Sequence, residues 1–115
     1  MAGISSPKDT FDLAEINDAC AYQLPMWAEG LGLADEGQGG QWVDSGAMDS
    51  QNINLSGGML NGNPLMLGGL ARSLEAVLQL KGEAGDRQVE GAKKAVAHGT
   101  TGAAGQHHAV LVLEK

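Results

Sequence analysis

Two polar residues follow apolar segments at positions where ligands commonly bind in α/β proteins. Asn17 comes directly after a predicted strand, at the carboxyl end where open α/β sheets place their ligands. Its neutral amide can donate a hydrogen bond to an oxyanion, although an asparagine before a helix is more often a cap or turn residue. His98 ends another predicted strand beside a glycine-rich hairpin. An imidazole there can act as an acid or base near neutral pH, or serve only structurally.

A third candidate lies in the segment Asn61-Gly62-Asn63-Pro64, which precedes the longest predicted helix. Asn63 can cap this helix through its side-chain oxygen, and Pro64 suits the first helical turn. The free N–H groups and the dipole at the same helix end also favour negative charge on a substrate oxygen. The structural and the functional interpretation can therefore both hold.

The other reactive side chains favour structural interpretations. Cys20 is the single cysteine, and we expect a small buried hydrophobic residue rather than a reactive thiol. His107 and His108 point to opposite faces of a predicted strand and cannot chelate one metal ion together, so we expect no metal site. The sequence has neither a G-x-G-x-x-G nor a G-x-x-x-x-G-K-[ST] phosphate loop, and no G-x-S-x-G elbow, which removes support from three enzyme classes.

Composition limits the possible functions further. The 115 residues make one domain, and 14 acidic against 7 basic residues give a formal charge of -7. This charge disfavours binding to nucleic acid or to an anionic membrane. No apolar run approaches the roughly 20 residues of a membrane-spanning helix, and no basic and apolar leader opens the chain. We therefore expect a cytoplasmic protein.

The first half of the chain predicts one strand, one helix and a long loop. A short strand is expected over residues 11–16. A helix is expected to begin with Asp18 as its cap, to kink or restart at Pro25, and to end at Gly30. Residues 34–51 mix acidic, polar and glycine residues without periodicity. This pattern indicates a long surface loop of the kind that serves an interface or a site.

The second half begins with a short strand, expected over residues 52–55. Leucine and valine then recur at intervals of three and four from Leu67 to Leu78. This spacing sets one apolar stripe along a helix that ends near Gly82.

Two further strands are expected over residues 93–98 and 107–114, joined by the segment GTTGAAGQ. The apolar run 109–113 suits an interior strand that is covered on both faces. The order strand, helix, strand, helix, strand, strand predicts an α/β layered fold.

Three segments resemble, in the right order, the motifs of one enzyme family. Residues 79–98 read QLKGEAGDRQVEGAKKAVAH, and residues 53–70 read INLSGGMLNGNPLMLGGL, similar to a strand–loop–helix motif with S-G-G and G-H-P. Residues 12–23, DLAEINDACAYQ, resemble an N-E-A-F segment. On these motifs nearly the whole chain resembles the carboxyl-terminal domain of thiolases, in particular the sterol-carrier-protein-x type and its archaeal and bacterial relatives.

The resemblance implies chemistry at a carbon–carbon bond beside an acyl-CoA thioester, with no bound cofactor. Asn17 matches the asparagine of N-E-A-F, which in relatives helps to hold the thioester or enolate oxygen. Asn63 replaces the histidine of G-H-P, and an amide can donate a hydrogen bond but cannot act as a base. Ala19 stands where some relatives carry an acid/base cysteine, and the C-x-G cysteine of other thiolases is also missing. His98 is therefore the candidate proton carrier.

The resemblance also implies a partner. The nucleophilic cysteine and most of the CoA-binding loop region belong to the amino-terminal half of the family fold. The first strand of the carboxyl-terminal repeat is also absent from residues 1–115. We therefore expect an incomplete layered fold whose open sheet edge pairs with a separate amino-terminal half, or with the remainder of a longer chain, in an oligomer.

Two functional hypotheses follow. In the first, the chain is the carboxyl-terminal part of a thiolase-like acyl-CoA acyltransferase or carbon–carbon lyase of lipid metabolism, and Asn17, Asn63 and His98 contribute to a composite site. Loss of the G-H-P histidine favours retro-aldol cleavage, which some relatives perform with small OB-fold partners, over thiolysis or Claisen condensation. In the second, the chain is a non-catalytic scaffold or assembly subunit.

Overall fold

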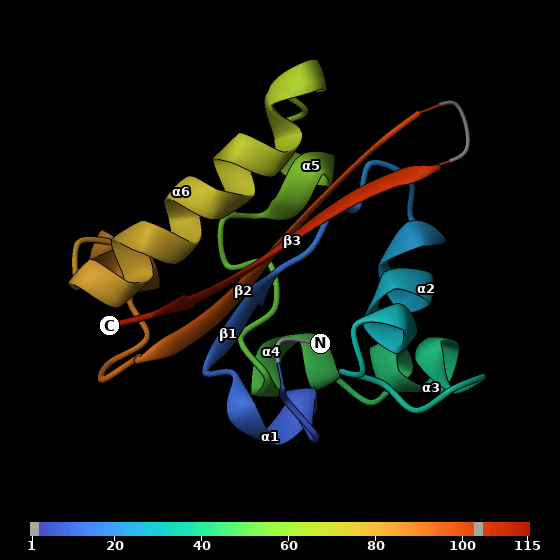
Figure 1. The fold of residues 1–115 in the computed structure, drawn as a ribbon, viewed down its shortest axis with the longest axis horizontal. Helices are drawn as coiled ribbons and strands as arrows, with labels where there is room; N and C mark the ends of the chain where they lie inside the picture. The colour runs from blue at the N-terminus through green and yellow to red at the C-terminus, as the bar shows by residue number, and fades with distance from the viewer. Residues whose placement is uncertain (1–2, 103–104) are drawn as a thin grey trace.

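The computed structural model describes residues 3–102 and 105–115. One mixed sheet has the strand order β1-β2-β3, with β1 parallel to β2 and β2 antiparallel to β3. Helix α6 lies on one side of this sheet, and α2 and α3 lie on the other (Figure 1). The predicted α/β layered fold is confirmed. The elements in chain order are α1 (Pro7–Thr10), β1 (Leu13–Glu15), α2 (Gln23–Gly30), α3 (Gly39–Asp44), α4 (Ala47–Ser50), α5 (Gly58–Asn61), the 3-10 helix η1 (Leu65–Leu67), α6 (Gly68–Lys81), the 3-10 helix η2 (Gly85–Arg87), β2 (Lys94–Thr101) and β3 (His107–Glu114).

Strand β2 is the centre of the sheet, and the core packs on both of its faces. Successive strand side chains point to opposite faces. Ala95 and Ala97 accordingly pack with Leu13 on the α6 side, whereas Val96 packs on the side of α2 and α3. The small residues of β2 let α6 approach closely, and a Cβ atom added to Gly99 would lie only 2.8 Å from the Cα atom of Gly69.

Strand β3 occupies the predicted residues 107–114, and β2 continues beyond the predicted end at residue 98. Residues 103–104 of the predicted connection lie outside the described residues. The expectation of an interior strand over residues 109–113 is wrong. Among the described residues β3 pairs only with β2, and the side chains of Val110, Leu111 and Val112 are exposed. The apolar run therefore lies at an edge of the sheet.

Helix α2 ends at Gly30 as predicted but begins later than expected. The prediction that Asp18 caps it is wrong, because Gln23 is its first residue and the Asp18 carboxylate instead accepts the N–H of Met59. Pro25 consequently lies in the first turn of α2, where a missing N–H costs little, and no kink is required.

The predicted loop over residues 34–51 is wrong, because this segment contains the short helices α3 and α4. Trp42 of α3 and Ala47 of α4 are buried in the cluster that contains Ala28 of α2. One large aromatic residue supplies the apolar surface that repeated leucines supply in longer helices. Such short helices carry too few apolar residues for their periodicity to be detected.

Residues 52–55 form a single bridge rather than a strand. Ile53 pairs with Ala14 of β1, and the flanking Asn52 and Asn54 both have φ of 53°. This left-handed conformation is incompatible with an extended strand. The segment nevertheless covers the outer edge of β1, because the Ala14 N–H donates to Asn52 O and the Ala14 carbonyl accepts the Asn54 N–H.

Helix α6 ends before Gly82 as predicted, with that glycine in the left-handed conformation that commonly terminates helices. Most of its apolar stripe lies on the surface: Leu70 is 56% exposed and Leu74 is 54% exposed. The buried side of α6 instead carries Arg72, Glu75 and Gln79, together with Gly68, Ala76 and Leu80. The polarity of this helix is therefore inverted relative to an ordinary surface helix.

Candidate functional site

Asn17 lies just beyond the carboxyl end of β1, on the sheet face that α6 covers. The residue is only 3% exposed, and its Nδ2 group donates to Gln23 Oε1 at 3.3 Å. A Cβ atom built on Gly68, the first residue of α6, would lie 3.8 Å from Asn17 Oδ1. The amide of Asn17 therefore borders the amino-terminal end of the longest helix.

A buried carboxylate that sequence reasoning missed lies on the same face. Glu15 is 0% exposed, and its carboxylate accepts the Ser56 N–H at 3.1 Å and the Ser56 hydroxyl at 2.6 Å. Arg72 Nε of α6 lies 3.1 Å from Glu15 Oε2. Burial raises the pKa of Glu15, while the Ser56 hydrogen bonds and Arg72 act to lower it. The available signal was a charged residue flanked by Ala14 and Ile16 inside a strand.

Asn63 lies in an exposed turn before α6. Its Oδ1 accepts the N–H of Leu65 at 2.8 Å, and this contact opens η1. The expectation that Asn63 and Pro64 open the long helix directly is wrong, because η1 intervenes and α6 begins at Gly68. The Oδ1 atom is engaged by the backbone. The Nδ2 group is the donor of this amide, and it is the group that can bind a ligand oxygen.

The imidazole of His98 is one of three rings that pack together on the other side of the sheet. Its Nε2 is 3.0 Å from Nδ1 of His108, and the two imidazole planes are 13° apart. Trp27 of α2 packs edge-on against both imidazoles. His98 is 3% exposed, and burial, with a smaller contribution from the charge of His108, lowers its pKa to about 4. The imidazole of His98 is therefore neutral at pH 7.

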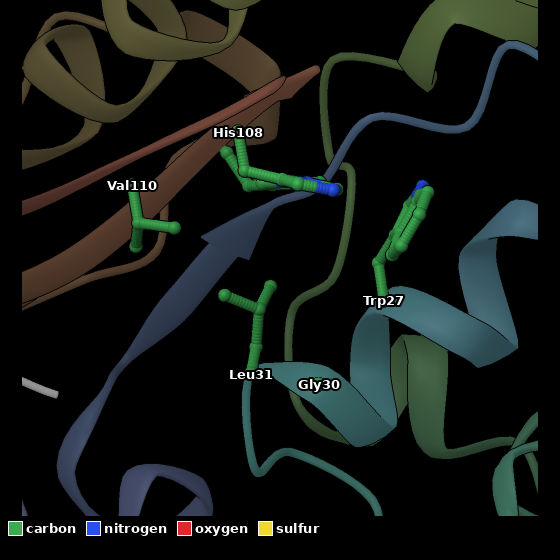
Figure 2. A pocket seen from close by; sticks show the side chains of 6 residues that line it. Trp27, Gly30, Leu31, His108 and Val110 are labelled. Carbon is green, nitrogen blue, oxygen red and sulfur yellow. The ribbon is translucent and has the colours of Figure 1, made fainter. Parts of the chain in front are cut away.

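A cavity of about 250 Å³ opens beside these rings, between α2 and the sheet. The side chains of Trp27, Leu31, His108 and Val110 point toward it from both elements (Figure 2). Its walls are mainly apolar. Among the described residues, His98 Nδ1 and Trp27 Nε1 are buried without a hydrogen-bond partner.

The strand register separates His98 from Asn17. Glu15 of β1 is paired with Ala97 of β2, and side chains paired across neighbouring strands share a face. Continuing this register places Asn17 beside Gly99, on the face covered by α6. His98 consequently points to the opposite face. The structure thus brings Asn17 to the start of α6 but does not bring His98 to the same place.

Cys20 is exposed, so its interpretation as a buried hydrophobic residue is wrong. It lies in the turn that precedes α2, rather than inside the helix expected from Asp18 onward.

Within residues 3–102 and 105–115, no group of three His, Cys, Asp or Glu side chains could hold a metal ion. In the same ranges, no helix has the length and apolar character needed to cross a membrane.

Comparison with known proteins identifies the family. The model of the thiolase C-terminal domain-like family matches residues 1–115. The chain belongs to this family. Sterol carrier protein 2 of Rattus norvegicus is 45% identical over 96 residues, which cover 80% of this chain and 17% of the relative. An acetyl-CoA acetyltransferase of Methanothermobacter thermautotrophicus is 39% identical over 103 residues, which cover 84% of this chain and 27% of the relative.

A more distant relative is non-specific lipid-transfer protein-like 2 of Caenorhabditis elegans, 34% identical over 97 residues, or 81% of this chain and 23% of the relative. The chain thus spans between 17% and 27% of the lengths of these three relatives. The resemblance to thiolases read from the sequence is confirmed.

Residues 79–98, one of the three segments that resemble thiolases, take part in a polar network around the buried side chain of Gln79. Gln79 donates to Glu75 Oε1 at 3.1 Å and to the Arg87 carbonyl at 2.7 Å, and it accepts the Val89 N–H at 2.8 Å. Arg87 donates to both oxygens of Glu75. The motif therefore fastens the turn after α6 to the helix and leads into β2.

Proposed function

We propose that this chain is the carboxyl-terminal part of a thiolase-like acyl-CoA acyltransferase or carbon–carbon lyase of lipid metabolism. A separate amino-terminal half, or the remainder of a longer chain, completes the site and supplies the nucleophile. The observation that carries the proposal is the place of Asn17, a buried amide at the carboxyl end of β1 beside the start of α6. Membership of the thiolase C-terminal domain-like family supports it.

In this proposal Asn17 and Asn63 donate hydrogen bonds to the thioester oxygen. Negative charge grows on that oxygen when an enolate or a tetrahedral adduct forms, so donors held in advance lower the barrier. The amino-terminal end of α6 adds its dipole to the same region. Removal of one such donor typically reduces kcat by about 100- to 1,000-fold.

The exposed apolar surface supports the requirement for a partner. Leu65, Met66, Leu67, Leu70 and Leu74 are all exposed along η1 and α6. Monomeric proteins rarely leave such a continuous apolar strip in water. We propose that the amino-terminal half covers this strip in a cytoplasmic oligomer. A small OB-fold protein is a second proposed partner, as in some thiolase-like relatives.

The amide at Asn63 favours cleavage of a β-hydroxyacyl-CoA over thiolysis. In retro-aldol cleavage a base takes the proton of the β-hydroxyl group, and the carbon–carbon bond breaks to give a carbonyl compound and an enolate. The two asparagines can hold the enolate oxygen while its carbon is protonated. Thiolysis also requires a base that activates the sulfur of CoA, and an amide is not a base. His98 remains the proposed proton carrier. Its imidazole is neutral at pH 7, but a pKa of about 4 makes it a weak proton acceptor, and it lies across the sheet from Asn17.

Co-purification from the source cell, followed by assay of the assembled complex, tests this function. We expect cleavage of a β-hydroxyacyl-CoA to exceed thiolysis of acetoacetyl-CoA. The Asn17→Ala and Asn63→Ala variants should each lose at least about 100-fold in kcat. Robust thiolysis without cleavage would refute the retro-aldol assignment.

The alternative is a non-catalytic scaffold that keeps the fold of its enzyme relatives. The amide of Asn63, the methyl group of Ala19 and the position of His98 away from Asn17 favour this alternative. The same variants separate the two functions. If the complex turns over substrate and the double Asn17→Ala, Asn63→Ala variant is equally active, the chain is a scaffold.

A further inference from the structure

Three contacts join β1 to α6 at matching intervals. Leu13 and Ala76 belong to one core cluster, Glu15 forms an ion pair with Arg72, and a Cβ atom built on Gly68 would lie 3.8 Å from Asn17 Oδ1. Two residues of a strand advance about 6.6 Å. Four residues of a helix advance about 6 Å. The strand and the helix are therefore antiparallel, with one contact for every two residues of β1 and every four residues of α6.

The ion pair is the only one of the three contacts whose chemistry allows a single register. Glu15 is 0% exposed and Arg72 is 4% exposed, and each charge needs the other because an unpaired buried charge is strongly destabilising. Sliding α6 by one turn would place Arg72 beside Leu13 or Asn17 and leave both charges unpaired. The contact acts electrostatically, since Arg72 Nε and Nη1 have no hydrogen-bond partner among the described residues.

The same carboxylate also fixes the turn that precedes α5. Both oxygens of Glu15 are engaged by Ser56, through its N–H and its hydroxyl. On the other side of Asn17, the Asp18 carboxylate accepts the N–H of Met59. A Cβ atom on Gly58 would collide with Asp18, so only glycine lets the turn come this close. Asn17 is therefore flanked by two carboxylates that hold one turn.

We propose that the Glu15–Arg72 ion pair is a positioning device: it sets the register of α6 on β1, and so places Asn17, the Ser56 turn and the start of α6 relative to one another. Its role in turnover rests on the proposed function. Neither residue touches the substrate. Both act through Asn17 and the segment that leads from Ser56 to Gly68, and this segment includes Asn63.

The test removes the ion pair without leaving a charge buried. Glu15→Gln alone leaves Arg72 unpaired and can prevent folding, so the main variant is the double Glu15→Gln, Arg72→Met. The matched control is Glu75→Gln, Arg87→Met, which removes a second ion pair of α6, one turn further along the helix. Arg72→Lys keeps the positive charge and serves as the conservative variant. All are prepared in the assembled complex.

Two measurements are made on each complex: kcat and KM for β-hydroxyacyl-CoA cleavage, and amide hydrogen exchange over residues 56–68. For the double variant we expect kcat to fall by about 10- to 100-fold with KM within twofold, because a misplacement of about 1 Å can cost 100-fold. Exchange over residues 56–68 should accelerate at least tenfold. The control should change neither quantity by more than twofold, and Arg72→Lys should retain more activity than the double variant.

An unchanged kcat, or an unchanged exchange rate over residues 56–68, in the double variant would overturn the proposal. A control that loses as much activity as the double variant would do the same, because the effect would then reflect general destabilisation. If the native complex neither cleaves a β-hydroxyacyl-CoA nor thiolyses acetoacetyl-CoA, the proposed function fails. The exchange measurement then still decides whether the ion pair holds this segment in place.

Discussion

The close approach of α6 to β2 makes a testable prediction about the fold. A Cβ atom on Gly99 would lie 2.8 Å from Gly69 Cα, whereas ordinary Cβ contacts begin at 3.4 Å. The obstructing atom belongs to the backbone, so no side-chain rotation relieves the contact. The Gly99→Ala variant must therefore move α6 away from the sheet by about half an ångström, in a core that is otherwise close-packed.

We expect Gly99→Ala to destabilise the chain by about 1–3 kcal/mol, the usual cost of overpacking. Urea unfolding followed by tryptophan fluorescence measures this free energy. With a slope of about 1–3 kcal/mol per molar urea, the midpoint should fall by roughly 1 M. Gly40→Ala in α3 is the control, because a Cβ atom there meets nothing within 4 Å. The control should be neutral or stabilising by up to about 1 kcal/mol.

An unfolding midpoint for Gly99→Ala equal to that of the native chain would refute the reasoning. It would mean that the two glycines do not set the distance between α6 and β2. Equal losses in Gly99→Ala and Gly40→Ala would also refute it, since the effect would then not depend on the space available at each position.

Two other predictions concern charge. The pKa of His98 is lowered from 6.5 to about 4. On acidification, the His98 imidazole therefore gains a proton in the unfolded chain before it does so in the folded chain. The contribution of neutral His98 to the free energy of unfolding is full above about pH 6.5 and falls toward pH 4. Urea midpoints measured from pH 7.5 to pH 4 should show a flatter profile for His98→Gln, and parallel profiles would contradict the burial argument. Leu74→Glu, on the exposed side of α6, should change the stability of the isolated chain by less than about 0.5 kcal/mol. The same variant should reduce recovery of the complex in co-purification, and full recovery would show that the partner does not cover this strip.

Elements with strong local signals could be predicted from the sequence. The strand over residues 107–114 and the end of α6 before Gly82 follow from an apolar run and a helix-terminating glycine. The position of Asn17 after a strand was likewise local information. Family motifs carried the fold class, because they sample the whole chain at once. The strand, the helix end and the position of Asn17 depend on residues within a few positions of one another.

Features set by distant contacts could not be predicted in the same way. The helices α3 and α4 depend on Trp42 packing with residues of α2, which lie far from it in sequence. The apolar stripe of α6 predicted the helix correctly, but tertiary contacts determine which side of that helix is buried. Arg72 pairs with Glu15, and Gln79 donates to the carbonyl of Arg87. Periodicity identifies a helix and its apolar side, and it does not say whether that side faces this chain or another.

The candidate site shows the same division. The sequence places His98 and Asn17 each at the end of a predicted strand, and it does not indicate which faces of the sheet they occupy. A shift of one residue in the pairing of β1 with β2 would reverse the answer. The burial of Glu15 could not be predicted, because a glutamate in a short strand ordinarily occupies a solvent-exposed position. Its burial depends on Arg72, which lies far along the chain.

The inverted polarity of α6 has a consequence for how the cell must handle this polypeptide. A surplus of free copies would display leucine side chains to one another and tend to precipitate, so its synthesis has to match the supply of whatever covers that helix. Variants that weaken docking should then lower its abundance through proteolytic turnover before any defect in chemistry becomes visible.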